Sequence, residues 1–499
     1  MLNRQKKMLS DQPPRQPQPF GVRGGLNRLL LHCRFDFRQK SWELPAGEFR
    51  RDAPSLFPAQ PTALVSAVSK NPSGFSAPSR SRTPLSMSTT KSKNMKSHTH
   101  GKSVHHVAIS AILGLTALAA GRIHATDGYF DYGYGTQAKG IGGAGVAFPQ
   151  DSLAPASNPA GDAFLTNRLD VGLTYFQPDR SASLGGQNYD GNGKEQFYEP
   201  EIGYKHSLSE NFDFGLAVYG NGGMNTDYKT PIAAFGTTHA GVDLDQLFFA
   251  PTLTYKLTED HAFGIAPIFA YQRFKAYGLE NFGIPDQGYD NSYGVGVRIG
   301  YTGRLTDWLT VGLTYQSPVF TTRFKEYEHL FAEQGSFDIP SNFAAGIAVK
   351  PVKQVTLALD VEEILYSDIN AVGNNLSAAT YANGLGANNG PGFGWRDVTA
   401  IKTGIAYEPI EELTLRVGYN YSTQPIPENQ TYFNILAPAV VQHHVTAGAT
   451  WRFAKNWEAT VFYAHAFEQQ VKGSGNFGGA NADLKMSQDT FGLALGWIL

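Results

Sequence analysis

The sequence predicts an all-β protein, a 14-stranded antiparallel transmembrane β-barrel with an N-terminal plug (hatch) in its lumen. Three observations predict it. Apolar residues alternate with small or polar ones along residues 168–499, the alternating segments are even in number, and their connections are alternately short and long. The composition agrees, because the 499 residues are 17% charged and 12% aromatic and include 54 Gly, whereas a soluble domain averages about 25% charged residues.

The first segment, residues 1–94, is basic and rich in proline, with 16 Lys/Arg against 5 Asp/Glu. Such a composition cannot bury a core. We expect either a spurious extension upstream of a true start at Met95 or a disordered arm, and an Arg-rich transit peptide is a third reading. The one cysteine of the chain, Cys33, lies in this segment, which argues against a disulfide framework and a Cys-based metal site.

Residues 95–125 are predicted to be a signal peptide. They begin with a cationic stretch, continue with an apolar run over 107–120 and end in small residues. The apolar run is too short for a transmembrane helix, which needs about 20 residues. Cleavage is expected after Ala125, with Ala117-Leu118-Ala119 as an alternative site, so the mature protein should begin near Thr126.

Residues 126–167 do not alternate and are rich in Gly, Ala, Asn and Pro. Irregular backbone is tolerated inside a barrel where protein surrounds it, and a 14-stranded barrel conducts solutes unless its lumen is filled. This segment is therefore predicted to be the hatch. Its Gly140-x-Gly142-x-x-Gly145 run has the residue pattern of a dinucleotide-binding fingerprint. No apolar strand precedes it and Pro149 would end a helix early, which argues against a nucleotide site.

The barrel is predicted to occupy residues 168–499. Its clearest alternation runs over 293–301, with apolar or aromatic residues on one face and Gly or Arg on the other. Alternation alone also fits a soluble sandwich, whereas a membrane barrel turns the apolar face to lipid. Strands are expected at 168–177, 197–207, 211–220, 245–257, 261–275, 291–305, 308–321, 342–351, 354–366, 396–408, 411–423, 442–454, 457–468 and 487–499.

The connections decide between barrel and sandwich. Six short turns alternate strictly with seven long loops, which is the layout of an outer-membrane barrel with both termini in the periplasm. Aromatic residues gather near the strand ends, as girdles at the two membrane interfaces would require. Because an open sheet edge is not tolerated in lipid, the last strand should pair with the first. The long loops are 178–196, 221–244, 276–290, 322–341, 367–395, 424–441 and 469–486.

The glycine-rich run from Gly135 to Gly145, followed by Asn158-Pro159-Ala160, resembles the hatch of the FadL/TodX family of outer-membrane transporters. The resemblance covers residues 126–499, and the chain departs from the family in ending with Leu499 where an aromatic residue is usual. Later segments that agree are Tyr315-Gln-Ser-Pro-Val, Phe337-Asp-Ile-Pro340, Lys402-Thr-Gly-Ile-Ala-Tyr407 and Leu415-Arg-Val-Gly-Tyr-Asn-Tyr-Ser with Pro425-Ile-Pro427.

This resemblance implies passive uptake of long-chain fatty acids or similar hydrophobic compounds across the bacterial outer membrane. Cargo would be caught between long loops, pass to a pocket in the barrel and leave sideways through the wall. Import of aromatic hydrocarbons is the main alternative. A general diffusion porin, a lipid-hydrolysing barrel and a surface adhesin fit the sequence less well. A monomer without catalytic activity or cofactor is expected, with outer-membrane lipid, lipopolysaccharide, hydrophobic small molecules and the barrel-assembly machinery as partners and no nucleic acid.

The expected ligand-binding residues follow from the cargo. A carboxylate in a low-dielectric lumen needs a cation. Arg273 and Lys275 resemble by position the basic pocket residues of the family, and Asp397 resembles its acidic one, although a solvated barrel rim would explain all three. The apolar candidates are Phe248, Phe249 and Phe282, with Phe235, Leu247, Phe320, Phe331 and Phe433 as further ones, unless they face lipid.

The lateral opening is expected at Gly220-Asn221-Gly222-Gly223, where the third strand ends. Glycine weakens strand pairing and permits bulges, and the run matches the kinked strand of the family. A plain loop start is the alternative reading. No metal site is expected, because the neighbouring His443 and His444 would point to opposite faces of a strand.

Overall fold

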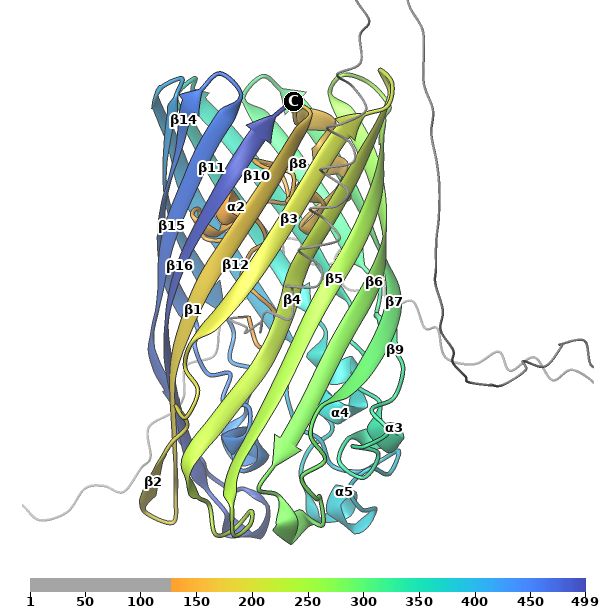
Figure 1. The fold of residues 1–499 in the computed structure, drawn as a ribbon, viewed down its shortest axis with the longest axis vertical. Coiled ribbons are helices and arrows are strands. Elements are labelled where there is room, and N and C mark those ends of the chain that lie inside the picture. The colour runs from red at the N-terminus through yellow and green to blue at the C-terminus, as the bar shows by residue number, and fades with distance from the viewer. Residues whose placement is uncertain (1–126) are drawn as a thin grey trace, which may run out of the picture. The chain divides into compact units, whose positions relative to one another are not determined.

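A computed structural model describes residues 127–499, in which 14 long strands form one closed antiparallel barrel (Figure 1). The predictions for residues 1–126, the signal peptide included, lie outside the described residues. The barrel strands are β1 (Arg168–Leu184), β3 (Phe197–Ser207), β4 (Phe212–Pro231), β5 (His239–Lys256), β6 (His261–Tyr277), β7 (Asp290–Thr306), β8 (Leu309–Gln316), β10 (Asn342–Val352), β11 (Val355–Ile364), β12 (Val398–Ile410), β13 (Leu413–Ser422), β14 (His443–Ala454), β15 (Trp457–Val471) and β16 (Ala482–Ile498).

The last strand closes the barrel on the first, as predicted. β16 pairs antiparallel with β1 without interruption, from Arg168 opposite Ile498 to Leu184 opposite Ala482. Each of the other barrel strands pairs with its neighbours in chain order. The predicted fold class, a 14-stranded antiparallel barrel, is therefore confirmed.

Several strands are longer than predicted at the end that carries the long loops. β1 continues to Leu184 and folds back on the short strand β2 (Gln187–Asp190), while β4 runs to Pro231 and β5 begins at His239. The predicted loops 178–196 and 221–244 are correspondingly wrong in extent. The reason is that these extensions carry many polar residues, so the apolar alternation that marks the membrane-spanning part stops before the strand does.

The outer face of the barrel carries an apolar band. Side chains that point outward from the middle of the strands are about half exposed, for example Leu253, Leu313 and Leu493. Trp308 and Trp451, at the short-turn end, are exposed in the same way, as an aromatic girdle requires. Within residues 127–499, none of the helices is both long and apolar enough to cross a membrane.

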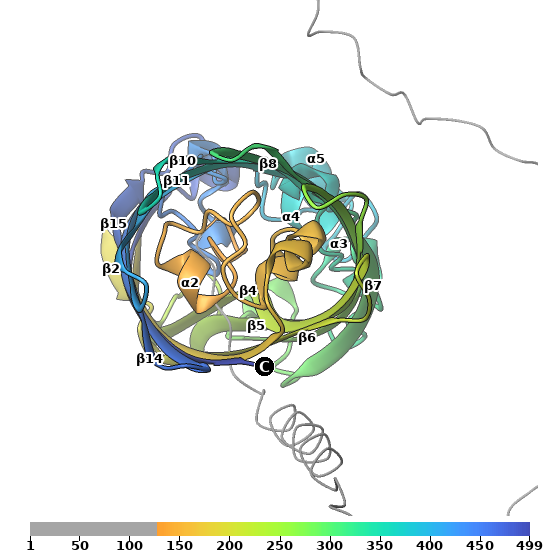
Figure 2. The same ribbon diagram turned by 90° about the horizontal axis from the view of Figure 1, so that it is seen from above.

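The two ends of the barrel differ (Figure 1). Short turns and the C-terminus lie at one end, and the long loops lie at the other. Viewed along the barrel, the hatch lies inside the ring of strands (Figure 2). The hatch contains α2 (Thr136–Lys139), η1 (Ala154–Ala156) and η2 (Pro159–Phe164), and the loops contain β9 (Phe320–Thr321), η3 (Glu280–Phe282), α3 (Ala332–Gly335), η4 (Tyr366–Asp368), α4 (Asn370–Gly373), α5 (Ala378–Ala382), η5 (Glu428–Gln430), η6 (Phe433–Ile435) and η7 (Phe477–Gly479).

Candidate functional site: hatch, wall and apolar pocket

Two buried lysines tie the hatch to the barrel. Lys139 of the hatch pairs with Asp131, also in the hatch, at 2.7 Å and with Glu199 of β3 at 3.2 Å. Lys402 of β12 pairs with Glu362 of β11 at 2.6 Å and with Asp127 of the hatch at 3.3 Å. Burial raises the pKa of Asp127 to about 6, and Lys402 opposes that rise.

Hydrogen bonds fix the backbone of the hatch. The carboxylate of Asp360, on β11, accepts from the backbone N–H groups of Gly145 at 2.7 Å and Val146 at 2.8 Å. The amide of Asn158 donates to the backbone oxygens of Val146 and Tyr301, at 2.7 and 3.0 Å, and its oxygen accepts from the N–H of Ala160 at 3.0 Å. Because these partners need exact placement, the hatch has one specific seat in the lumen.

Close approach explains the small residues of the hatch. Gly142 has a φ of +76°, and a Cβ there would lie 2.8 Å from the backbone nitrogen of Tyr419 on β13. At Gly140 a Cβ would lie 3.2 Å from the Cα of Gly448 on β14. The carbonyl of Pro159 accepts from the Thr254 hydroxyl of β5 at 2.6 Å. The structure thus places all six predicted hatch residues, Gly140, Gly142, Gly145, Asn158, Pro159 and Ala160, inside the barrel.

The barrel wall is incompletely paired between β3 and β4. Their ladder begins at the short-turn end and stops where Ile202 lies opposite Val218. β4 continues beyond that point and pairs with β5, with a bulge between Gly220 and Gly222. Pairing with residues of the segment between β1 and β3 begins only at Asp227, whose backbone bonds Gly191 and Gly193 at 3.1 and 2.8 Å. The segment of β4 between Val218 and Asp227 is the wall gap.

The predicted opening, Gly220-Asn221-Gly222-Gly223, lies in the wall gap, but it is part of a continuing strand and not the end of one. The hatch pairs with this part of β4: the backbone N–H of Gly223 donates to the Tyr129 oxygen at 3.0 Å, and the backbone N–H of Asp131 donates to the Asn221 oxygen at 3.1 Å. A Cβ at Gly222 would overlap the Tyr129 carbonyl. Substituting Gly222 would therefore disturb the hatch as well as the wall.

An apolar pocket lies at the long-loop end of the lumen. Phe274 of β6 packs on Phe331 with ring centroids 4.7 Å apart, and Phe282 packs on Phe433 at 5.3 Å. Further loop residues line the apolar pocket, and none of its lining side chains is charged. Its lining comprises Val242, Phe274, Leu279, Phe282, Leu330, Phe331, Ala371, Leu385, Pro391, Gly392, Phe393, Phe433 and Leu436.

The predicted charged ligands do not reach this pocket. Arg273 and Lys275 share the outward-facing phase of β6 with Phe263 and Phe269, which are about half exposed. Arg273 pairs there with Asp245 at 2.7 Å. The carboxylate of Asp397 accepts from the backbone N–H of Ser367 at 2.9 Å, which ties one loop to another.

The predicted phenylalanines divide between lumen and lipid. Phe248 is buried in the lumen against Tyr219, with centroids 5.7 Å apart, and Phe235 packs on Phe282. Phe249 and Phe320 are exposed on the outer face. Leu247 lies in the same outward phase as Phe249.

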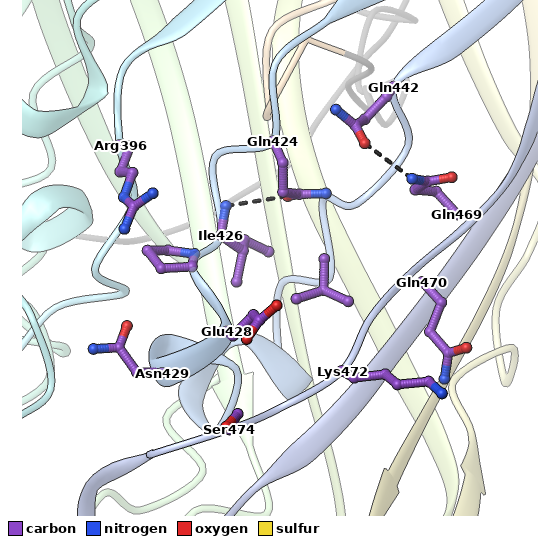
Figure 3. A pocket seen from close by; sticks show the side chains of 12 residues that line it. Arg396, Gln424, Ile426, Glu428, Asn429, Gln442, Gln469, Gln470, Lys472 and Ser474 are labelled. Atoms are coloured by element: carbon purple, nitrogen blue, oxygen red, sulfur yellow. Dashed lines mark hydrogen bonds between the residues drawn. The ribbon is translucent and has the colours of Figure 1, made fainter. Parts of the chain in front are cut away.

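A polar pocket lies between the loops around residues 424–430 and 469–474 (Figure 3). Its side chains include Arg396, Glu428 and Lys472, and Gln469 donates to Gln442 at 2.9 Å. Such a lining suits water and polar groups. A hydrocarbon tail would gain little there.

The sequence interpretation missed the charged residues that point into the lumen from the strands. Glu199, Asp360, Lys402 and Glu458 each lie in the buried phase of a strand whose other face is apolar. The alternation itself could have identified them. On a strand whose other face is turned to lipid, a charged side chain in the alternate positions must point into the lumen.

Comparison with known proteins agrees with this architecture. Residues 134–496 match the family model of the outer membrane transport proteins OMPP1/FadL/TodX. Among curated protein sequences, none matches the chain significantly. Solved structures that resemble it are a Pseudomonas aeruginosa FadL homologue (16% identity, TM-score 0.58, 74% of this chain and 99% of that one), the Pseudomonas putida toluene transporter TodX (17%, 0.57, 75% and 100%) and the Ralstonia pickettii toluene transporter TbuX (17%, 0.54, 74% and 99%).

Proposed function

The chain belongs to the OMPP1/FadL/TodX family of outer membrane transport proteins, and from that premise we propose that it takes up long-chain fatty acids or similar hydrophobic compounds by passive transport and releases them sideways through its wall. The family places the protein in the bacterial outer membrane and makes it a transporter. The cargo and the lateral route are the proposal.

The wall gap is the observation that carries the lateral route. Beyond Val218 β4 has no partner in β3, and before Asp227 its edge on that side bonds hatch residues 129–131 in place of a barrel strand. Moving a C16 tail from the apolar pocket into water would cost on the order of 12 kcal/mol, at about 0.8 kcal/mol for each CH₂. A path from lumen to lipid avoids that cost.

Aromatic hydrocarbons are a second candidate cargo. The observation in their favour is the apolar pocket, whose lining has five phenylalanines and no charged side chain. Aromatic ligands pack well against such rings. Competition between a C16 fatty acid and toluene for uptake would rank the two cargoes.

The lateral route can be tested by closing the wall gap reversibly. Residues 126–499 contain no cysteine, so introduced pairs are specific. We expect that Pro200→Cys with Gly220→Cys, joined by a reducible bifunctional thiosulfonate, blocks uptake of a labelled C16 fatty acid, and that reduction restores it. The matched control is Tyr204→Cys with Leu216→Cys, which are already opposite each other in the paired part of the same strands.

Loss of uptake in the first pair alone supports lateral release. Equal uptake before and after cross-linking of the first pair would show that cargo passes along the lumen. If the parent protein takes up neither fatty acid nor hydrocarbon, the proposed cargo itself is wrong.

A further inference from the structure

Arg180 is a buried cation whose hydrogen-bond acceptors are all neutral. It lies in the inward-facing phase of β1, and its side chain is 1% exposed. Its guanidinium donates to the backbone oxygen of Asn225 at 2.5 Å and to the side-chain Oδ1 of Asn225 at 3.0 Å, and also to the backbone oxygen of Lys194. All these acceptors are neutral, and the carboxylates of Asp179, Asp227 and Asp243 act on the guanidinium only from beyond ion-pair distance. A buried charge in such surroundings is costly.

Other buried arginines have a structural use that Arg180 lacks. Arg168 pairs with Asp170 at 2.7 Å and with Glu458. Arg298 and Arg416 have no ion pair of this kind, but they donate to the hatch: Arg298 to the Ser157 oxygen at 3.2 Å and Arg416 to the side chains of Gln137 and Gln150. Arg180 donates to no residue of the hatch, so anchoring the hatch does not explain it.

The surroundings of Arg180 are an apolar cleft at the wall gap. Phe176 and Pro178 of β1, Met224 of β4, Met486 of β16 and Gly128 of the hatch line it together with Arg180. Pairing of β1 with β3 ends where Phe176 lies opposite Phe197. At the level of Arg180, β3 therefore no longer separates β1 from β4, and the guanidinium reaches across to Asn225. The cleft lies at the edge of the wall gap nearer the long loops.

We propose that Arg180 and this cleft form a subsite for the carboxylate of a long-chain amphiphile, with the tail directed toward the wall gap. The inference rests on the proposed function and specifies its substrate class. A carboxylate can accept two parallel N–H bonds from a guanidinium, and such charge-assisted bonds are stronger than bonds to neutral oxygens. An anionic head would therefore replace a neutral acceptor and balance the buried charge, whereas a hydrocarbon could do neither.

The test compares two probes of equal length, labelled palmitate and hexadecane, taken up by cells that carry the full-length protein. Arg180→Met keeps much of the side-chain volume and removes the cation. We expect it to lower palmitate uptake by about tenfold or more, the factor expected for losing one charge-assisted bond, and to change hexadecane uptake little. Arg273→Met removes a cation from the outer face and serves as the matched control.

A second variant covers the case in which Arg180→Met does not fold. Asn225→Asp keeps the shape of the side chain and puts a carboxylate 3.0 Å from the guanidinium. This built-in counter-ion should compete with the cargo, so palmitate uptake should fall while hexadecane uptake remains. The heat-modifiable band of the folded barrel confirms assembly of each variant.

Each result decides the proposal. Selective loss of palmitate uptake in Arg180→Met, or in Asn225→Asp if Arg180→Met does not fold, supports it. Equal loss of both probes in that variant, or no loss, overturns it. A parent protein that takes up hexadecane alone overturns the carboxylate subsite and leaves transport of hydrophobic compounds standing. A parent that takes up neither probe refutes both proposals.

Discussion

The two halves of the lumen are held together by different forces. At the short-turn end the hatch is fixed by buried ion pairs, such as Lys139 with Glu199 and Lys402 with Asp127, and by directional hydrogen bonds, such as those to Asp360. At the long-loop end, rings such as Phe274 and Phe331 pack on one another. Directional bonds specify one position, whereas apolar packing tolerates rearrangement. The hatch should therefore be rigid, and the apolar pocket should adapt its shape to the cargo.

Deleting the hatch is the largest change that would test this comparison. Removal of residues 126–167 should leave the barrel foldable, because its strands pair without the hatch, and should convert a nearly closed protein into one with steady ion conductance in planar bilayers. Conductance equal to that of the parent would show that the long loops occlude the lumen by themselves.

Breaking one anchor should have a smaller but clear effect. Lys139→Met leaves Asp131 and Glu199 buried without their cation, a loss of about 3–5 kcal/mol for a buried pair, so the hatch should exchange its amide hydrogens faster and conductance should become intermittent. Lys229→Met, which breaks the exposed pair with Asp190, should change neither property appreciably, because water screens such a pair. If the two variants behave alike, the hatch does not depend on its ion pairs.

Enlarging the apolar pocket should alter selectivity more than stability of the hatch. Phe331→Ala removes a ring that packs on Phe274 and Phe337, so longer or bulkier cargo should be favoured, by up to about fourfold for each methylene newly accommodated. Phe320→Ala removes an exposed ring from the outer face and is the control. Uptake measured over a series of chain lengths would show whether only the first variant shifts the preference.

The smallest effect concerns pH. Because burial raises the pKa of Asp127 to about 6, the seated hatch favours the protonated acid. Protonation of Asp127 thus stabilises the bound position of the hatch. This stabilisation is fully present below about pH 4 and is lost as the pH rises through about 6. Hydrogen exchange of the peptide around residues 127–134 should therefore become relatively faster between pH 5 and 7. Asp127→Asn should flatten that dependence, and an unchanged slope would contradict the role of this carboxyl.

Much of the barrel could be predicted because lipid imposes a strict pattern. Rows such as Phe263, Ile265 and Phe269 must stay apolar along the whole membrane-spanning part of a strand, and closure forces β16 onto β1. The same parity places Arg273 and Lys275 on the outer face, since they continue that row. Their assignment to the ligand pocket relied on their position relative to family members. It did not take into account that they alternate in step with the lipid-facing residues of the same strand.

The contacts of the hatch were less predictable. Glycines such as Gly142 signal a close approach, but the partner strand, β13, lies far along the chain and no local pattern identifies it. The role proposed for Arg180 was likewise unpredictable. It depends on where the pairing of β3 with β1 and β4 ends, because only beyond that point can a β1 side chain contact β4. Long-range register of this kind is not encoded within any one segment.

The seat of the hatch has a consequence for the order of assembly. Gly142 donates its backbone N–H to the Thr446 hydroxyl of β14, and Lys139 lies near residues of β3, so one short segment joins both ends of the sequence. The segment that precedes all the strands thus has no complete binding surface until late strands are in place, and closing so long a loop is slow. We expect barrel closure to precede or accompany final seating of the hatch, which makes that seating one of the last steps of folding.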